Sequence, residues 1–362
     1  MGIDAFSLSN LLVISCIGTQ HQRRDSMIFS FKKITASLHA LTFHGLVDNY
    51  PKYSVYPSTR GCHIYVTDFV KILEICSKNY YFARLSDIET YLDGAGNRPA
   101  ILLTFDDGLN SVTDLAVPIL RKFSASALVF VNTSWVDSGQ SPAIFDLERQ
   151  LWEIVPVRVG IEVLGLRYEI TISDRSLIGT AVDNIWRFLL SNKVAPLNLK
   201  KNNFYFNEKN WSNYLHSGSD ALWAPATWDK LRTCVLDGTF EIGSHGESHI
   251  PWPWLNEMEL KKELQGSKCR LQNELEIDVT SCSYPHGLSN VDTEFAVSAS
   301  YYAGFGTSAG VINSSSYRAN LPRFHVPSGR PNGLPWIVDH RRTGRLLRKG
   351  KSILDSIFEP RL

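Results

Sequence analysis

Short runs of apolar residues alternate along the chain with segments whose apolar residues recur at helical spacing. Residues 38–43, 100–105 and 127–131 are continuous apolar runs with the length of buried strands. Residues 67–77 and 113–123 have the periodicity of amphipathic helices and lie between these runs. Strands that alternate with helices in this way predict a parallel α/β sheet or barrel.

This alternation is interrupted between residues 145 and 225. The interval contains a predicted hairpin around 161–172, a helix near 181–190 and a polar segment near 200–215, so we interpret it as an insertion that elaborates one loop. The alternation then resumes with predicted elements at 228–235, 240–242, 257–275, 279–284, 291–300 and 321–326.

Composition and charge exclude several classes of protein. With 44% hydrophobic and 20% charged residues among 362, the chain has the composition of a folded globular protein. Its 37 Lys and Arg residues against 36 Asp and Glu give a net charge of +1, so no global field gathers nucleic acid and we expect no such partner. The six cysteines are far apart and predict buried or free thiols.

The two ends of the chain fall outside the predicted fold. Residues 1–37 form an N-terminal extension that could be disordered, and its apolar run at 11–17 is too short to span a bilayer and follows no Lys or Arg. We therefore expect a cytoplasmic or peripheral membrane protein rather than a secreted one. Residues 331–362 form a basic tail, which is either solvated or in contact with an acidic membrane or glycan surface; its charges are Arg341, Arg342, Arg345, Arg348, Lys349 and Lys351.

Two adjacent acids follow the predicted strand at 100–105. Asp106 and Asp107 cannot point to the same side, so in a barrel one can face a metal ion while the other faces substrate or water. The alternative is a structural Asx-turn in which Gly108 supplies a positive φ.

A pair of histidines four residues apart provides the second candidate. His245 and His249 suit Zn²⁺ and related ions, although Gly246 and Pro251 exclude the long helix of a zinc metalloprotease. Alone, such a pair is equally consistent with surface or core histidines. Together with one carboxylate it makes a three-ligand set that leaves positions open for water and substrate, as a catalytic metal site requires.

Four segments, taken in order, resemble the motifs of polysaccharide deacetylases of the NodB-homology, carbohydrate esterase family 4 type: residues 104–108, 241–249, 283–287 and 321–326. The resemblance implies a distorted (β/α) barrel with an inserted subdomain, covering residues 38–330 with the insertion at about 145–225. It also implies metal-dependent hydrolysis of N-acetyl or sometimes O-acetyl groups on sugars. Asp107, His245 and His249 would be the metal ligands and Asp106 the catalytic base.

The sequence departs from the family pattern at two positions. Thr280 occupies the place of the arginine of the third motif, and we take Arg323 as the substitute partner of Asp106. The late catalytic histidine also has no obvious match. Residues 41–44 resemble the strand end of circularly permuted members, so we assign His44 as the acid in preference to His325. A strand-end histidine bonded to a backbone carbonyl is the structural alternative for His44.

These motifs together predict a deacetylase that acts on N-acetyl groups of amino sugars in a polysaccharide or glycan precursor, with Zn²⁺, or Co²⁺ or Ni²⁺ in its place. Two alternatives stay open: a metal-dependent hydrolase of another acyl or C–N bond on a small molecule, and a non-catalytic carbohydrate-binding barrel. We expect Tyr284, Pro285 and Trp252 to bind the glycan. The rings of Tyr284, Trp252, Trp254 and Trp135 could stack against sugars, with core packing as the alternative for each tryptophan.

Overall fold

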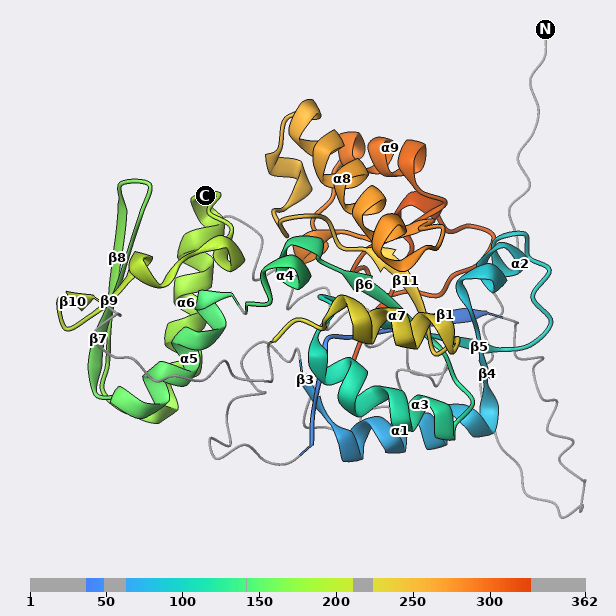
Figure 1. Cartoon of the computed structure of the whole chain (residues 1–362), viewed down its shortest axis with the longest axis horizontal. Helices are drawn as coiled ribbons and strands as arrows, with labels where there is room; N and C mark the ends of the chain where they lie inside the picture. Colours follow the sequence, from blue (N-terminus) through green and yellow to red (C-terminus); the bar gives the residue numbers. More distant parts are fainter. Residues whose placement is uncertain (1–36, 49–62, 141, 211–223, 327–362) are drawn as a thin grey trace, which may run out of the picture. The chain divides into compact units, whose positions relative to one another are not determined.

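A computed structural model describes residues 37–48, 63–140, 142–210 and 224–326 (Figure 1). Its main sheet has eight strands, all paired in parallel, in the order β13-β12-β11-β6-β5-β1-β14, with β4 also paired to β5. This arrangement confirms the predicted distorted (β/α) barrel. The strands are β1 (Leu38–Phe43), β4 (Tyr81–Phe82), β5 (Ala100–Phe105), β6 (Ala127–Val131), β11 (Phe240–Ser244), β12 (Ser281–Ser283), β13 (Ala303–Phe305) and β14 (Phe324–His325).

The central strands are apolar along their whole length because both of their faces are buried. In β5, Ile101 and Leu103 belong to one hydrophobic cluster, whereas Ala100 and Leu102 belong to a second cluster with residues of β1, β6 and β13. Successive side chains of a strand point to opposite faces, so each face packs into its own core. Burial on both sides is typical of parallel sheets and explains the continuous apolar runs.

Helices follow most of the strands, as the periodicity predicts. The predicted helix at 113–123 differs in one respect: it starts as a π-helical turn, η2 (Val112–Ala116), because Pro118 at the start of α3 lacks the N–H of a regular helical bond. Figure 1 shows α7 beside β11 and α8 beside α9. The helices are α1 (Val66–Asn79), α2 (Ile88–Leu92), α3 (Val117–Lys122), α4 (Thr133–Ser138), α7 (Trp228–Leu236), α8 (Glu257–Leu275) and α9 (Val291–Ser300).

A second sheet lies within the segment predicted as an insertion. Its four strands are antiparallel, in the order β10-β9-β7-β8, and the helices α5 (Ala143–Ile154) and α6 (Ile178–Ser191) belong to the same segment. The observed hairpin is longer than predicted and turns at Leu164-Gly165, both with positive φ. The strands are β7 (Val157–Val163), β8 (Leu166–Ile172), β9 (Phe204–Phe206) and β10 (Lys209–Asn210); the boundaries at 145 and 225 stay a prediction.

A short parallel pair, β2 (Gly45–Val47) and β3 (His63–Tyr65), completes the strands of the described residues. Cys76, Cys234 and Cys282 are buried thiols and Cys269 is an exposed one, as expected for free cysteines. Nearly all of the N-terminal extension and the whole basic tail lie outside the described residues. No helix in the described part of the chain combines the length and apolarity needed to cross a membrane.

Candidate metal and catalytic site

The candidate ligands come together where β5 and β11 end. Asp107 lies two residues beyond β5, His245 follows β11 directly, and His249 belongs to the loop after it. Because β5, β6 and β11 are parallel neighbours, their carboxyl ends meet at one edge of the sheet. This is the edge where α/β barrels carry their catalytic residues.

The spacing of the three donor atoms fits one metal ion. Oδ1 of Asp107 lies 3.6 Å from Nε2 of His245 and 3.3 Å from Nε2 of His249, and the two Nε2 atoms are 3.1 Å apart. Tetrahedral zinc with ligand bonds of about 2.0–2.1 Å separates its ligands by roughly 3.3 Å. All three side chains are buried, and the structure therefore supplies a preformed three-ligand set.

The protonation states of this set also suit a metal. Nδ1 of His245 lies 3.0 Å from the carbonyl oxygen of Ser283, so Nδ1 carries the proton and Nε2 offers its lone pair. Burial lowers the pKa of His245 to about 4 and keeps its ring neutral at pH 7. Burial opposes ionisation of Asp107, but the bond from His249 and the nearby imidazoles hold its pKa well below the usual range. Neutral imidazoles and an ionised carboxylate are the forms that bind metals.

Two of the candidate ligands have left-handed backbone conformations. Asp107 has a φ of 75° and His249 a φ of 57°, which are uncommon for residues other than glycine. Gly108 also has a positive φ, of 69°, as the Asx-turn interpretation requires. The turn at Asp107 separates its carboxylate from that of Asp106, so the two acids have different partners.

Asp106 forms a buried ion pair with Arg323. Nη1 of Arg323 lies 2.7 Å from Oδ1 and Nη2 lies 2.9 Å from Oδ2, and both residues are at most 4% exposed. The guanidinium also donates to Thr104, Ser283 and the carbonyl of Gly306. Although burial disfavours the charged form, Arg323 holds the pKa of Asp106 below its ordinary value.

Strand register places His44 beside Asp106. β1 pairs with β5 so that Phe43 faces Phe105, and the next residues along the two strands are His44 and Asp106. Electrostatic attraction to His44 also contributes to lowering the pKa of both Asp106 and Asp107. His325 lies on β14, faces Thr42 of β1 and is exposed; its ring centre lies 6.1 Å from that of His44.

The three residues expected to bind substrate are packed inside the protein. Trp252 is 0% and Tyr284 1% exposed, their rings meet edge to face, and Pro285 is buried next to them. The hydroxyl of Tyr284 donates to the carbonyl of Ala319. Trp135 is 5% exposed and stacks on His249 rather than facing solvent. The structure therefore corrects the prediction that these side chains stack on sugars, because core packing covers their faces.

Two residues that support the site were missed by the sequence analysis. The Glu263 carboxylate on α8 accepts hydrogen bonds from the loop that carries the histidines. The side-chain amide of Asn132 donates to the Glu247 carbonyl at 3.0 Å, and its oxygen accepts the backbone N–H of His249 at 2.9 Å. Neither residue belongs to a motif, and only the structure shows that they are buried beside the histidine loop.

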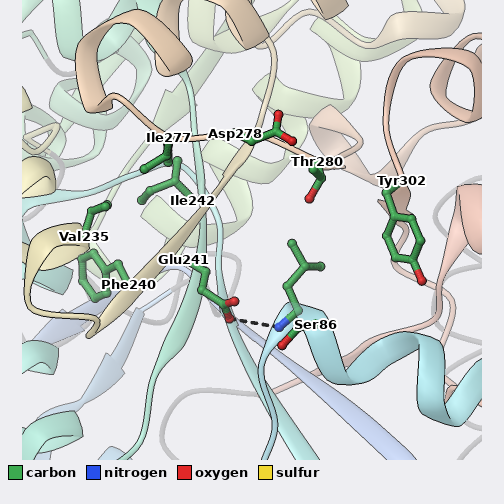
Figure 2. Close-up of a pocket in the computed structure, with 10 residues that line it drawn as sticks. Ser86, Val235, Phe240, Glu241, Ile242, Ile277, Asp278, Thr280 and Tyr302 are labelled. Carbon is green, nitrogen blue, oxygen red and sulfur yellow. Dashed lines mark hydrogen bonds between the residues drawn. The ribbon is translucent and has the colours of Figure 1, made fainter.

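A cavity of about 370 Å³ lies at the other end of the barrel strands (Figure 2). Its wall includes Glu241 at the start of β11, Thr280 just before β12 and Tyr302 just before β13. The Glu241 carboxylate accepts the Leu85 N–H at 3.0 Å, and burial raises its pKa. None of the candidate catalytic residues lines this cavity.

Comparison with known proteins assigns the fold and the family. The chain matches the polysaccharide deacetylase family over residues 93–156 and 198–304, and the unmatched stretch between them contains β7, β8 and α6. No sequence among curated proteins matches the chain. The fold is similar to that of the deacetylase PplD from Streptococcus pyogenes, solved with acetate, at 16% identity and a TM-score of 0.54, covering 84% of this chain and 98% of that one. It is also similar to IcaB from Ammonifex degensii, at 15% identity and a TM-score of 0.52, covering 83% and 97%.

Proposed function

Because the chain belongs to the polysaccharide deacetylase family and is therefore a hydrolase of carbon–nitrogen bonds, we propose that it removes N-acetyl groups from amino sugars of a polysaccharide or glycan precursor. The proposal includes a divalent metal ion; Zn²⁺ is the favoured ion, and Co²⁺ or Ni²⁺ could take its place. The observation that carries it is the convergence of Asp107, His245 and His249 beside the buried Asp106–Arg323 pair.

Asp107, His245 and His249 would hold the ion, through one carboxylate oxygen and two Nε2 atoms. An ion in this place supplies a Lewis acid that polarises a carbonyl and lowers the pKa of a water molecule. Three protein ligands leave coordination positions open, which distinguishes a catalytic site from a structural one.

Asp106 is the proposed general base. Its lowered pKa keeps it ionised at neutral pH, so it can accept a proton from the attacking water. Arg323 contacts both carboxylate oxygens and fixes their plane without taking up all of their lone pairs. Arg323 would thus fill the role of the arginine that Thr280 replaces.

His44 is the proposed general acid. An amine leaves poorly unless it is protonated while the C–N bond breaks, and an imidazole can donate a proton near neutral pH. The register of β1 on β5 supports His44, because it sets this residue at the level of Asp106. The exposed His325 is its direct competitor, since the two rings are neighbours.

Acetate release from short oligomers of N-acetylated amino sugars tests the proposal. We expect the metal-loaded chain to release acetate and leave free amines, and we expect Asp106→Asn to lose this turnover. Hydrolysis of small acyl amides without any action on N-acetylated sugars would instead favour the alternative of a small-molecule hydrolase. Binding of the sugars without turnover of either substrate would favour a non-catalytic barrel.

A further inference from the structure

We propose that two side chains outside the ligand set, Trp135 and Glu263, are positioning residues that hold His249 ready to bind metal. The inference rests on the proposed function, since it takes Asp107, His245 and His249 as the metal site. It adds a second layer of residues that no motif of the sequence contains.

The two histidine ligands are supported differently. His245 is fixed by its own hydrogen bond, from Nδ1 to the Ser283 carbonyl. Nδ1 of His249 is buried and has no hydrogen-bond partner within the part of the chain that the structure describes. Metal-binding histidines usually donate this second N–H to a carbonyl, a carboxylate or a water, which fixes the plane of the ring. For His249, contacts of another kind must therefore limit the rotation of the ring.

Trp135 provides such a contact. Its indole lies nearly parallel to the His249 imidazole, with ring centres 5.2 Å apart and an angle of 19° between the planes. The ring of His286 meets His249 edge to face at 4.6 Å. Rotation of the His249 ring about its Cβ–Cγ bond would push it into one of these neighbours. Stacking thus keeps Nε2 directed at Asp107 in place of a hydrogen bond at Nδ1.

Glu263 holds the backbone that carries His249. Its Oε2 accepts the N–H groups of Glu247 at 2.7 Å and Ser248 at 3.1 Å, and its Oε1 accepts the Ser248 hydroxyl. Glu263 is 8% exposed, so its carboxylate is largely removed from solvent. Since a buried charge without hydrogen bonds is costly, these three donors stabilise the carboxylate and the carboxylate orders the loop.

Gly246 permits this close approach of helix and loop. A Cβ atom at this position would meet Oε2 of Glu263 at 2.9 Å, and the φ of +82° is one that other residues rarely adopt. Gly246, which distinguishes this motif from the helical motif of zinc metalloproteases, is therefore required by the local structure. It lets the buried carboxylate of α8 reach the loop between the two histidines.

Metal affinity measured by competition with a chelator tests the proposal, with Co²⁺ as the probe because its visible spectrum reports the geometry of its ligands. We expect Trp135→Leu and Glu263→Ala each to weaken Co²⁺ binding about 10- to 100-fold, as is typical when the partners of a metal ligand are removed, and to change the spectrum. Trp135→Phe keeps a stacking ring and Glu263→Gln keeps an acceptor oxygen, so both should recover much of the affinity and the parental spectrum.

Matched controls come from the same chain. Trp152 is also a buried tryptophan, at 7% exposed, and Glu274 also lies on α8, where it pairs with Arg232 and Arg270. Trp152→Leu and Glu274→Gln should leave Co²⁺ affinity and spectrum unchanged even where they lower the melting temperature. Thermal melting of the metal-free variants shows which of them fold; where one of the two large substitutions prevents folding, the folded variant at the other position decides by its measured affinity and spectrum.

The outcomes separate this proposal from the proposed function. If the parent chain binds no Co²⁺ or Zn²⁺, the metal site and the proposed mechanism are wrong. If the parent binds Co²⁺ while the folded Trp135 and Glu263 variants match its affinity and spectrum, the positioning proposal is wrong and the metal site stands. Equal losses in the Trp152 and Glu274 controls would also overturn it, because a general loss of stability would then explain the effect.

Discussion

Asp106 and Asp107 are neighbours in the sequence, yet each carboxylate has its own environment. The positive φ of Asp107 turns the chain between them, so that Asp107 faces the two imidazoles and Asp106 faces Arg323. The charged form is favoured at both positions, by different partners. At the residue scale the two acids thus have separate partners, as the proposed roles of metal ligand and general base require.

Substitution of each acid by its amide distinguishes these roles. We expect Asp107→Asn to lower metal content in elemental analysis. Asp106→Asn should retain the metal and lose most turnover, since a general base typically supplies 10²–10⁴-fold. Asp106→Asn also leaves the buried Arg323 without its counter-charge, so a melting curve must accompany the assay. Equal loss of metal in both variants would contradict the assignment.

The two adjacent histidines at the strand ends offer a matched comparison. We expect His44→Ala to keep metal and fold and to lose most amide hydrolysis, with a smaller loss on an activated ester whose leaving group needs no proton. His325→Ala should retain most activity on both substrates. Normal amide turnover in His44→Ala together with collapse in His325→Ala would move the acid to β14 and exclude the permuted assignment.

Acid should destabilise the metal-free protein through His245. Burial lowers the pKa of this imidazole from 6.5 to about 4, so between these values the unfolded chain binds a proton that the folded chain does not. Stability therefore falls as the pH falls through this window, by the order of 2 kcal/mol from this residue at pH 5. Urea unfolding of the chelated protein at pH 7 and pH 5 measures the change. A folded His245→Asn variant should show a smaller difference, and an unchanged difference would assign the effect to other groups.

At the scale of elements, one residue beside β14 ties several strands of the barrel together. Arg323 precedes β14 and contacts Thr104 on β5, Ser283 on β12 and the carbonyl of Gly306 beyond β13, besides its pair with Asp106. Every polar group of this buried pair therefore has partners from different strands. Such a network is stable when complete and costly when one member is removed.

Removal of the guanidinium should destabilise the barrel strongly. We expect Arg323→Met to lower the free energy of unfolding by about 3–5 kcal/mol, because Asp106 is left as an unpaired buried charge. The double variant with Asp106→Asn should lose less than the sum of the two single losses. Urea denaturation of the four proteins provides the cycle; strictly additive losses would show that the pair does not act as a unit.

At the scale of the whole molecule, the family match covers the barrel and the segment predicted as an insertion to different extents. The family match stops at residue 156 and resumes at 198, leaving out β7 and β8 of the antiparallel sheet and the helix α6. All candidate ligands and catalytic residues except Arg323 and His44 lie within the two matched segments. The unmatched stretch at 157–197 therefore contains none of the candidate ligands or catalytic residues.

Metal removal should affect the whole molecule, because an ion that binds only the folded chain stabilises it. Chelation should lower the melting temperature and abolish acetate release, and added Zn²⁺ should restore both. At an ion concentration of 100 times the dissociation constant the stabilisation amounts to about 2.7 kcal/mol. A melting temperature that is the same with and without chelator would show that no metal binds to the folded chain.

The sequence by itself determined the alternation of strands and helices, the family and the two motifs that contain Asp107, His245 and His249. These features are local: continuous apolar runs predict buried strands, and a carboxylate after a strand or two imidazoles four residues apart are visible as spacing. Only the tertiary structure decided which distant residues complete the site. The register of β1 on β5 places His44 at the level of Asp106. Arg323, which lies just before β14, pairs with the same carboxylate although it is far away in the sequence. Packing also moved Tyr284 and Trp252 from predicted sugar contacts into the core, because burial of an aromatic ring depends on neighbours that no local pattern specifies.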